Sequence, residues 1–446
     1  MSLQSSIDNA LAQTSPGRPV WVAVSGGLDS CLLLTLAASA ARRHPRTLYA
    51  LHVNHGLQAA AREFETHCRR LCSRLGVPLF VERIEVSVSN GLGVEGAARE
   101  ARYAAFARRV AIGDTLWLAQ HRRDQAETFL LAALRGSGVR GLAAMPHERD
   151  WRGRCLIRPW LDVPRATLED AASRSGLEWI EDPSNTDQGL DRNFLRHRVL
   201  PLLESRWPAT QASLAQAASL AGEADILLGD LAALDLAAAG GDPGCLSVAS
   251  LAGLSPPRQR LLIRDCCARL GLALPGGARL SSLLDQLEAR YDAEACVAWE
   301  GGEGRIWRGA LYLQAPFAAL PADWQTEWDG AAALQTPVGR LTLGLQAESG
   351  ERCGLWLRAR QGGERLELAH RGRRDLKRLL QEWEVPPWQR SRLLVAWHGD
   401  RVAAVLGEGL PGGGVTSAGW RLLPGAVRAP AENRPSVDTR LPARDR

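Results

Sequence analysis

Lysine is almost missing from this sequence. Lys377 is the only lysine among 54 basic residues, so arginine carries nearly every positive charge. The planar guanidinium group of arginine suits bidentate recognition of phosphate and carboxylate groups. An arginine-rich codon usage explains the same composition without any functional cause. The formal net charge of +5 permits a nucleic-acid partner but does not require one.

Long apolar runs and paired cysteines are lacking as well. No stretch reaches the roughly 18 apolar residues of a membrane span. The first 19 residues have neither the basic nor the apolar region of a secretory signal, so we expect a cytoplasmic protein. Nine cysteines are too few for a disulfide framework in 446 residues. Cys68 and Cys72 form C-x-x-x-C without a second pair at zinc spacing, which favours buried, reduced thiols over a metal site.

Strand-like and helix-like segments alternate through the first third of the chain. The pattern predicts an α/β fold with a doubly wound, mostly parallel sheet. Such sheets bind ligands at the carboxyl ends of their strands. Strands are expected at 20–24, 47–53, 78–86 and 115–119, and helices at 29–41, 59–75, 94–111 and 124–135.

The composition changes near residue 208, where an Ala/Leu-rich stretch predicts a long amphipathic helix packed against a bundle. Two further helical stretches follow, and after Trp299 short runs punctuated by glycine indicate strands, with a last helix near 374–384. The predicted segments are a catalytic domain (1–207), a mainly helical domain (208–314), a linker (315–338), a mixed α/β domain (339–428) and a disordered tail (429–446).

The stretch "SGGLDS", residues 25–30, lies where the first strand ends and the first helix begins. Glycines let backbone N–H groups approach an anion, the helix N-terminus adds positive potential, and two serines supply hydroxyl donors. The lysine of the G-x-x-x-x-G-K-[ST] loop is lacking. Asp29 is there instead, and a carboxylate beside phosphates makes sense chiefly through Mg²⁺. We therefore predict a phosphate-binding loop with Asp29 as a metal ligand.

S-G-G-x-D-S after a strand resembles the PP-loop of the N-type ATP pyrophosphatases, which cleave ATP between its α- and β-phosphates and adenylate a substrate. "LHVNHGL" (51–57), "DQAETFLLAALRGSGVRGLAAM" (124–145), "RPWLDVPRATL" (158–168) and "EDPSNTDQGLDRNFLRHRVLPLL" (181–203) resemble the tRNA(Ile)-lysidine synthetases. This resemblance implies adenylation of carbon 2 of the wobble cytidine in a tRNA(Ile) with a CAU anticodon. The ε-amine of L-lysine then displaces AMP. ATP and Mg²⁺ would be used.

The resemblance also assigns roles to individual residues. Asp124 and Glu127, three positions apart at a helix start, face one way and would hold the lysine ammonium, although a solvated helix N-terminus is the alternative. Arg192 and Arg196, one helical turn apart, would clamp phosphates or the lysine carboxylate, unless they form a surface stripe. The predicted catalytic residues are Asp29, Asp124, Glu127 and Arg192, and the predicted lysine-binding residues are Asp124, Glu127, Arg192 and Arg196.

The ATP site is expected at the loop and at the end of the second strand. His52 is included in it, whereas a polar loop explains His55 equally well. The predicted ATP-binding residues are Ser25, Gly26, Gly27, Leu28, Asp29, Ser30 and His52.

Two features of the central motifs need separate treatment. The family usually shows His-x-x-Asp-Asp-Gln, but here Arg123 replaces the first acid, which puts any metal or base role at that position in doubt. "GSGVRG" (136–141) satisfies G-x-G-x-x-G, yet it follows a predicted helix rather than a strand, so we do not expect dinucleotide binding.

The C-terminal third contains eight basic residues between Arg358 and Arg378, with Trp383 and Trp388 following. Basic clusters neutralise RNA phosphates and aromatic rings stack on exposed bases, although a charge run is more often a solvated face. The stretch resembles the tRNA-binding domain at the C-terminus of the same family. The predicted tRNA-binding residues are Arg99, Arg371, Arg373, Arg374, Lys377 and Arg378.

Three other functions are weighed against this interpretation. A sulfur-inserting tRNA enzyme of the same fold generally needs a C-x-x-C pair, which is lacking. A glutamine-dependent synthetase needs a reactive cysteine in an amidotransferase domain, and position 2 is Ser2. A catalytically silent RNA-binding relative is disfavoured by the intact loop. The oligomeric state, a homodimer included, stays open.

Overall fold

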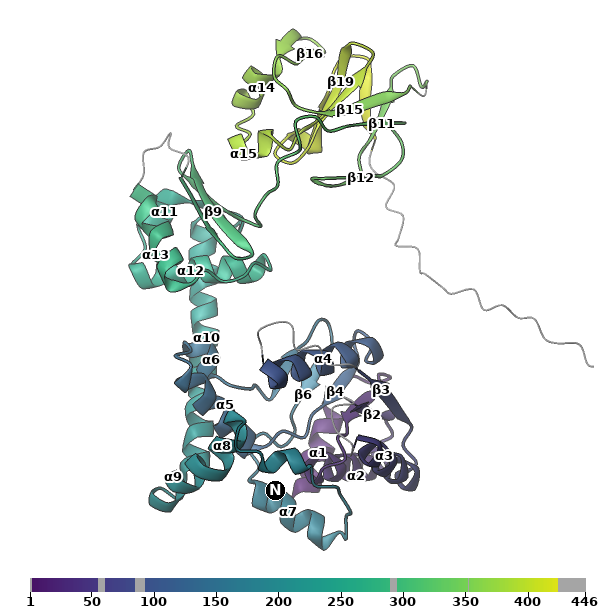
Figure 1. The fold of residues 1–446 in the computed structure, drawn as a ribbon, viewed down its shortest axis with the longest axis vertical. Helices are drawn as coiled ribbons and strands as arrows, with labels where there is room; N and C mark the ends of the chain where they lie inside the picture. The colour runs from purple at the N-terminus through teal and green to yellow at the C-terminus, as the bar shows by residue number, and fades with distance from the viewer. Residues whose placement is uncertain (1, 55–60, 85–92, 289–294, 352, 424–446) are drawn as a thin grey trace, which may run out of the picture. The chain divides into compact units, whose positions relative to one another are not determined.

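The computed structural model describes residues 2–54, 61–84, 93–288, 295–351 and 353–423 (Figure 1). The chain divides into two compact units, Met1–Leu231 and Ala232–Arg446. His55, the last residues of the strand expected at 78–86 and the tail expected at 429–446 lie outside the described residues. No helix of the described chain is long and apolar enough to cross a membrane.

The first unit contains a six-stranded sheet in the order β3-β2-β1-β4-β6-β5. Neighbouring strands run parallel except for β5, which is antiparallel to β6, so the predicted α/β fold with a mostly parallel sheet is confirmed. The hairpin of β5 and β6 was not predicted, because three-residue strands carry too little periodicity. The strands are β1 (Val20–Ala23), β2 (Leu48–Asn54), β3 (Leu79–Arg83), β4 (Thr115–Trp117), β5 (Glu148–Asp150) and β6 (Cys155–Ile157).

Helices cover both faces of this sheet (Figure 1). Along β1, Val20 and Val22 point into the core with α1, α2, α3 and α7, whereas Trp21 belongs to the core under α4. This alternation follows from the two-residue period of a strand, and burial on both faces requires apolar residues throughout. The helices are α1 (Leu3–Ala12), α2 (Leu28–Arg43), α3 (Ala61–Leu75), α4 (Gly93–Arg109), α5 (Arg122–Leu134), α6 (Val139–Leu142) and α7 (Arg165–Arg174).

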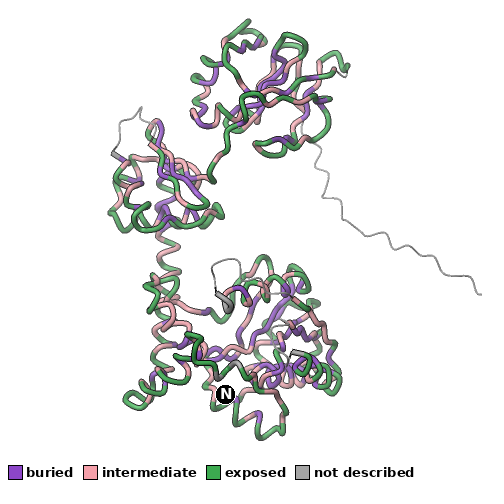
Figure 2. The backbone as a smooth tube through the Cα atoms, in the orientation of Figure 1, coloured by how far each residue is buried: buried purple, intermediate pink, exposed green. Residues whose placement is uncertain are grey.

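A run of helices follows the sheet: η1 (Pro183–Thr186), α8 (Asp191–Phe194), the π-helical turn η2 (Leu195–Val199), α9 (Leu200–Arg206) and α10 (Thr210–Ala238). The long helix predicted after residue 208 is α10. Its buried apolar residues lie towards its two ends, such as Ala218 and Leu236, whereas Ile226 and Leu227 in the middle are 67% exposed (Figure 2). The apolar stripe predicted along the whole helix is therefore buried only in part.

The second unit begins with a four-stranded antiparallel sheet in the order β7-β10-β9-β8. The helices α11 (Val248–Ala252), α12 (Pro256–Arg269), α13 (Gly277–Asp285) and the turn η3 (Gln286–Glu288) accompany it. Leu262, Ile263 and Cys266 of α12 share one core with Leu311 of the sheet. The strands are β7 (Cys245–Ser247), β8 (Ala295–Trp299), β9 (Gly302–Trp307) and β10 (Ala310–Gln314).

The last part of the chain is built on a five-stranded sheet, β11-β15-β18-β19-β20, with three two-stranded sheets beside it. Residues 315–338, expected as a linker, contain β11 and β12, and β11 pairs with β15. The helices are α14 (Leu376–Glu382), α15 (Pro387–Arg390) and η4 (Pro411–Gly413). The strands are β11 (Gln325–Trp328), β12 (Leu334–Thr336), β13 (Gly339–Leu341), β14 (Gly344–Ala347), β15 (Leu355–Ala359), β16 (Arg365–Leu368), β17 (Gly372–Asp375), β18 (Leu394–His398), β19 (Arg401–Leu406), β20 (Gly414–Thr416) and β21 (Trp420–Leu423).

Candidate active site

The segment Ser25–Ser30 joins β1 to α2 at the point where the strand order reverses, since β2 and β4 flank β1. Gly26 has φ +97°, and a Cβ at this position would lie 2.9 Å from the Phe64 ring, so only glycine fits. The Ser30 hydroxyl accepts from the Ser25 backbone N–H at 3.0 Å and donates to the Gly27 carbonyl at 3.0 Å. Among the described residues, no side chain caps α2 at Gly27. The helix N-terminus is therefore open to an anion.

A cavity of about 920 Å³ opens beside this loop. Its walls come from the loop, from the ends of β2 and β4, from the start of α5 and from α4, α7 and the 179–185 segment. Ile180 donates its backbone N–H to the Gly26 carbonyl at 3.0 Å, which fixes that segment on the loop. The predicted site residues that line the cavity are Ser25, Gly27, Leu28, Asp29, Ser30, His52, Arg99, Asp124 and Arg196.

Asp29, in the first turn of α2, faces two basic side chains. Arg165 of α7 approaches Asp29 Oδ2 to 3.1 Å, and His121 Nε2 lies 3.8 Å from the same oxygen. Burial raises the pKa of Asp29, and the charges of His121 and Arg165 oppose that rise. The other oxygen, Oδ1, is buried and accepts no hydrogen bond from the described residues. Asp29 thus keeps one free acceptor beside the loop.

Asp124 and Glu127 lie in the first turns of α5 and face the same arginine. Arg196 donates to Glu127 through Nε at 2.7 Å and through a terminal nitrogen at 2.9 Å, and that nitrogen lies 3.4 Å from Asp124 Oδ1. Arg192 Nε approaches Glu127 at 3.3 Å. The Glu127 side chain is 0% exposed, so two guanidiniums neutralise a fully buried carboxylate. The prediction that the two acids face one way is confirmed by this shared partner.

Asp124 also accepts the His121 backbone N–H at 3.0 Å, which satisfies one free donor of the α5 N-terminus. Burial by itself would raise the pKa of Asp124, but His121, Arg192 and Arg196 outweigh it and lower the pKa. The carboxylate is therefore ionised at neutral pH.

His52, at the end of β2, is 3% exposed. Its Nδ1 lies 2.9 Å from the Val24 carbonyl. Because a carbonyl only accepts, Nδ1 carries the proton and Nε2 is left as an acceptor. Burial lowers the pKa of His52, and Nε2 has no hydrogen-bond partner among the described residues. A buried acceptor is thus placed at the cavity wall.

One rim of the cavity combines arginine with aromatic rings. Arg99 lies 5.1 Å from the centroid of the Tyr103 ring on α4, and Arg149 of β5 lies 5.6 Å from it. Trp151 packs edge-on against Tyr103 at 5.5 Å. Guanidinium groups over an aromatic ring are held without losing their positive charge.

His121 and Arg165 were not among the predicted site residues, although both lie in quoted motifs. Arg165 is 136 positions from Asp29 and meets it only through the packing of α7. The one available signal was the motif "RPWLDVPRATL" itself. "GSGVRG" follows α5 and contains the start of α6, so the prediction that it follows a helix rather than a strand is confirmed.

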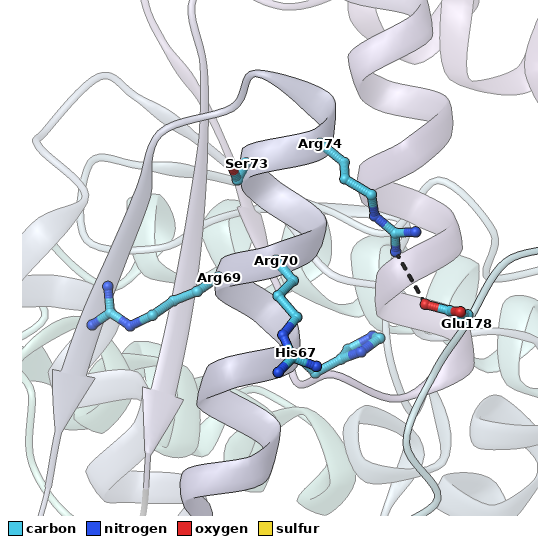
Figure 3. Close-up of a pocket in the computed structure, with 6 residues that line it drawn as sticks. All are labelled: His67, Arg69, Arg70, Ser73, Arg74 and Glu178. Carbon is cyan, nitrogen blue, oxygen red and sulfur yellow. Dashed lines mark ion pairs between the residues drawn. The ribbon is translucent and has the colours of Figure 1, made fainter.

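A second, smaller hollow of about 530 Å³ lies on the outer face of α3 (Figure 3). Arg74 pairs with Glu178 at 3.6 Å, and His67 and Arg70 lie beside them. None of the predicted site residues lines this hollow.

The predicted tRNA-binding residues of the second unit lie on β17, α14 and the turn before β17, and all are exposed. Arg371 pairs with Glu382 at 2.8 Å, and Arg374 donates to the Arg371 carbonyl at 3.0 Å. Trp388, suggested as a base-stacking residue, is only 9% exposed and packs on Tyr312 at 5.2 Å, so that suggestion was wrong.

Three family models and several curated relatives match this chain. A PP-loop domain covers residues 1–203, a TilS substrate binding domain 246–312 and a TilS substrate C-terminal domain 355–422. A tRNA(Ile)-lysidine synthase of Xanthomonas axonopodis pv. citri is 47% identical over 404 residues, which is 88% of this chain and 90% of the relative.

The chain belongs to the tRNA(Ile)-lysidine synthase family. Other members include the enzymes so named from Pseudomonas fluorescens, 44% identical over 90% of this chain and 91% of the relative, and from Xylella fastidiosa, 44% identical over 87% and 90%. Among solved structures, the U34-tRNA thiolase NcsA from Methanococcus maripaludis, with its [4Fe-4S] cluster, matches with a TM-score of 0.40 and 15% identity over 48% of this chain and 76% of that chain.

The family supports the lysidine interpretation over a sulfur-inserting one. The nine cysteines are unpaired, and no group of three or more metal-binding side chains occurs in the part of the chain that the structure describes. Burial raises the pKa of Cys31 to about 12 and that of Cys72 to about 11, so both thiols are protonated at neutral pH.

Proposed function

We propose that this chain is an ATP-dependent ligase that joins L-lysine to carbon 2 of the wobble cytidine in a tRNA(Ile) with a CAU anticodon, forming lysidine. The observation that carries the proposal is one cavity lined by a glycine-rich phosphate loop and by Asp124 and Arg196, and Arg196 also donates to the buried Glu127. The loop supplies donors for a nucleotide, and the acids suit an ammonium group. The names of the curated relatives agree with this pairing of ligands.

ATP would bind with its phosphates over Gly27 and the N-terminus of α2. The free Nε2 acceptor of His52 suits the exocyclic amino group of adenine, a donor. The residues of the loop also fit a magnesium ion. Asp29 Oδ1 is a buried oxygen without a partner among the described residues, and Mg²⁺ is typically bound through one or two carboxylates together with phosphate oxygens. Bound there, the ion would neutralise charge on the departing pyrophosphate.

L-Lysine would bind at Asp124 and Glu127, where Arg196 now lies. Two carboxylates with three nearby arginines can accept an ammonium group and leave guanidiniums for the lysine carboxylate. Arg192 and Arg196 would provide that clamp. The π-helical turn that contains Arg196 is the type of local irregularity that often occurs at functional sites.

Two displacements would then take place in the same cavity. In the first, the oxygen on carbon 2 of cytidine bonds to the α-phosphorus while the bond to the β-phosphate oxygen breaks, and pyrophosphate leaves with the electron pair. In the second, the neutral ε-amine bonds to carbon 2, the carbon–oxygen bond breaks, AMP leaves with that electron pair, and the amine proton passes to water. The protein contributes positioning and charge stabilisation to both steps.

The tRNA would be held at two places. Arg99 and the aromatic rim lie beside the cavity that the cytidine must enter, and exposed single-stranded bases stack on such surfaces. Arg371, Arg373, Arg374, Lys377 and Arg378 would neutralise phosphates elsewhere on the tRNA.

The test is an incubation of the full chain with ATP, Mg²⁺, isotopically labelled lysine and a tRNA transcript with a CAU anticodon. Nucleoside mass spectrometry should detect labelled lysidine, and a transcript with a GAU anticodon serves as the control. Unmodified cytidine after complete incubation would rule out the proposal. Sulfur incorporation in place of lysine would favour a thiolase.

A further inference from the structure

Arg123 lines the same cavity as the phosphate loop and Asp124. It is the second residue of α5, its side chain lines the cavity, and that side chain is 23% exposed. The charge of Arg123 acts on Asp29 of the loop, and the charges of Arg165 and Arg196 act on Arg123. The guanidinium therefore lies among the groups that would surround the reacting phosphate.

One donor of Arg123 is not used by the described residues. Arg123 Nε is buried and bonds to no atom of the described residues. The nearest carboxylate oxygen, Glu127 Oε1, is 4.0 Å away and already accepts a hydrogen bond from Arg196 Nε. A buried guanidinium nitrogen without a hydrogen bond is unfavourable, so this arrangement favours a ligand that accepts one. Burial and the repulsion from Arg165 and Arg196 also lower the pKa of Arg123.

We propose that Arg123 binds the α-phosphate of the nucleotide, first in ATP and then in the adenylated cytidine. The inference rests on the proposed function, because the α-phosphate is the group that takes part in both displacements. It lies next to the pyrophosphate that leaves in the first step and next to the carbon that lysine attacks in the second. Arg123 lines the cavity together with Asp29, and its Nε lies 4.0 Å from Glu127 Oε1.

The residue type at this position makes the proposal specific to this chain. Position 123 of this chain is occupied by a guanidinium with donors of its own. A carboxylate can approach a phosphate only through a cation, whereas arginine contacts it directly. The proposal assigns to Arg123 the stabilisation of negative charge on the non-bridging oxygens during both bond exchanges.

The experiment compares Arg123→Gln with Arg122→Gln in the full chain. Arg122 precedes it on α5, carries the same charge and does not line the cavity. Equilibrium binding of ATP, AMP and pyrophosphate is measured without tRNA, and transfer of AMP from α-labelled ATP to the tRNA is measured without lysine. Arg123→Lys is added to separate charge from bidentate geometry, and thermal unfolding confirms that each variant is folded.

Arg123→Gln should weaken the binding of ATP and of AMP by the same factor and leave the binding of pyrophosphate unchanged. It should slow the transfer of AMP to the tRNA by about 10²- to 10³-fold, the range seen when one transition-state donor is removed. Arg123→Lys should recover part of the rate, and Arg122→Gln should match the unaltered protein. Loss of ATP and pyrophosphate binding with AMP unaffected would overturn the assignment, because it would place Arg123 on the outer phosphates. A raised KM for lysine alone would place it on the lysine carboxylate and would also overturn it.

These readouts separate the two proposals. If the unaltered protein forms no lysidine, the proposed function fails, yet equal weakening of ATP and AMP in Arg123→Gln still supports the phosphate contact. If lysidine forms and Arg123→Gln binds AMP normally, the proposed function stands and the role of Arg123 is wrong.

Discussion

The arginines of the catalytic cavity and those near α14 are the same residue type in opposite settings. Arg196 is 15% exposed and donates to Glu127, which is 0% exposed. Arg371 is 49% exposed, and its partner Glu382 is 48% exposed. The first pair is shielded from salt and held in one geometry, whereas the second is screened by water and ions. The arginines of this chain therefore occupy two physically different environments.

The difference predicts how each group acts on a ligand. In the cavity, the guanidiniums are already oriented by carboxylates, so little reorganisation is needed when a charged substrate arrives. On β17 and α14, exposed side chains can attract a polyanion over a distance and adapt to its backbone. Substitutions in the first group should change chemical steps, and substitutions in the second should change affinity and its salt dependence.

Glu127→Ala should have the largest effect. It leaves Arg192 and Arg196 without their buried carboxylate, which costs about 3–5 kcal/mol of unfolding free energy. Urea unfolding checks this value. The more conservative Glu127→Gln should stay folded and raise the KM for lysine, with transfer of AMP to tRNA reduced much less. Equal loss of both steps would show that Glu127 only maintains the cavity.

Asp29→Asn should have the second largest effect. It keeps the shape of the side chain but removes the carboxylate that faces Arg165 and the loop. We expect tRNA-dependent ATP–pyrophosphate exchange to fall by roughly 10²-fold, as for other groups that stabilise a charged transition state. The variant should also need more Mg²⁺ for half-maximal exchange if Asp29 is a ligand. An unchanged Mg²⁺ dependence would argue against that role.

The C-terminal arginines should give a smaller, salt-dependent effect. Replacing Arg371, Arg373 and Arg374 with glutamine should weaken tRNA binding by about tenfold and lower the slope of log K against log salt by up to about 3. Filter binding at several salt concentrations measures both. The control replaces Arg62, Arg70 and Arg174, three exposed arginines of α3 and α7, with glutamine, so that the net charge falls by the same amount. If the control lowers affinity and slope equally, only the net charge matters.

The smallest expected effect concerns Glu65 of α3, outside the cavity. Burial would raise its pKa, but hydrogen bonds from Arg69, Asn54 and Arg83 outweigh this and lower the pKa from 4.5 to about 2. A carboxyl group whose pKa is lower in the folded than in the unfolded chain stabilises the fold at pH values above the unfolded pKa. This stabilisation is lost as the pH falls from about 4.5 to 2. Glu65→Gln should reduce the acid dependence of unfolding in that window and leave catalysis unchanged. An identical pH profile would contradict the depressed pKa.

The sequence was sufficient where a site is built from neighbouring residues. Ser25, Gly26 and Ser30 lie within six consecutive residues and could be assigned to a phosphate loop from their pattern. The parallel sheet followed from the alternation of apolar segments. Asp124 and Glu127 could be placed on one face because a helix fixes their spacing.

The sequence did not predict contacts between segments that are distant along the chain. Arg165 reaches Asp29 from 136 positions away, and Arg196 reaches Glu127 from 69. Periodicity contains no information about such pairs. Trp388 looked like an exposed stacking residue because it follows a basic run, yet its neighbours in space are Tyr312 and Trp307. Three-residue strands such as β5 are too short to produce a pattern.

The most direct test of one cavity performing both displacements is a two-stage reaction. The protein is first incubated with α-labelled ATP and tRNA bearing a CAU anticodon without lysine, then unreacted ATP is removed and lysine is added. The account predicts that labelled AMP becomes attached to the tRNA in the first stage and is released in the second as lysidine appears in equal amount. Lysidine that forms without prior attachment of AMP, or attached AMP that lysine does not displace, would contradict it.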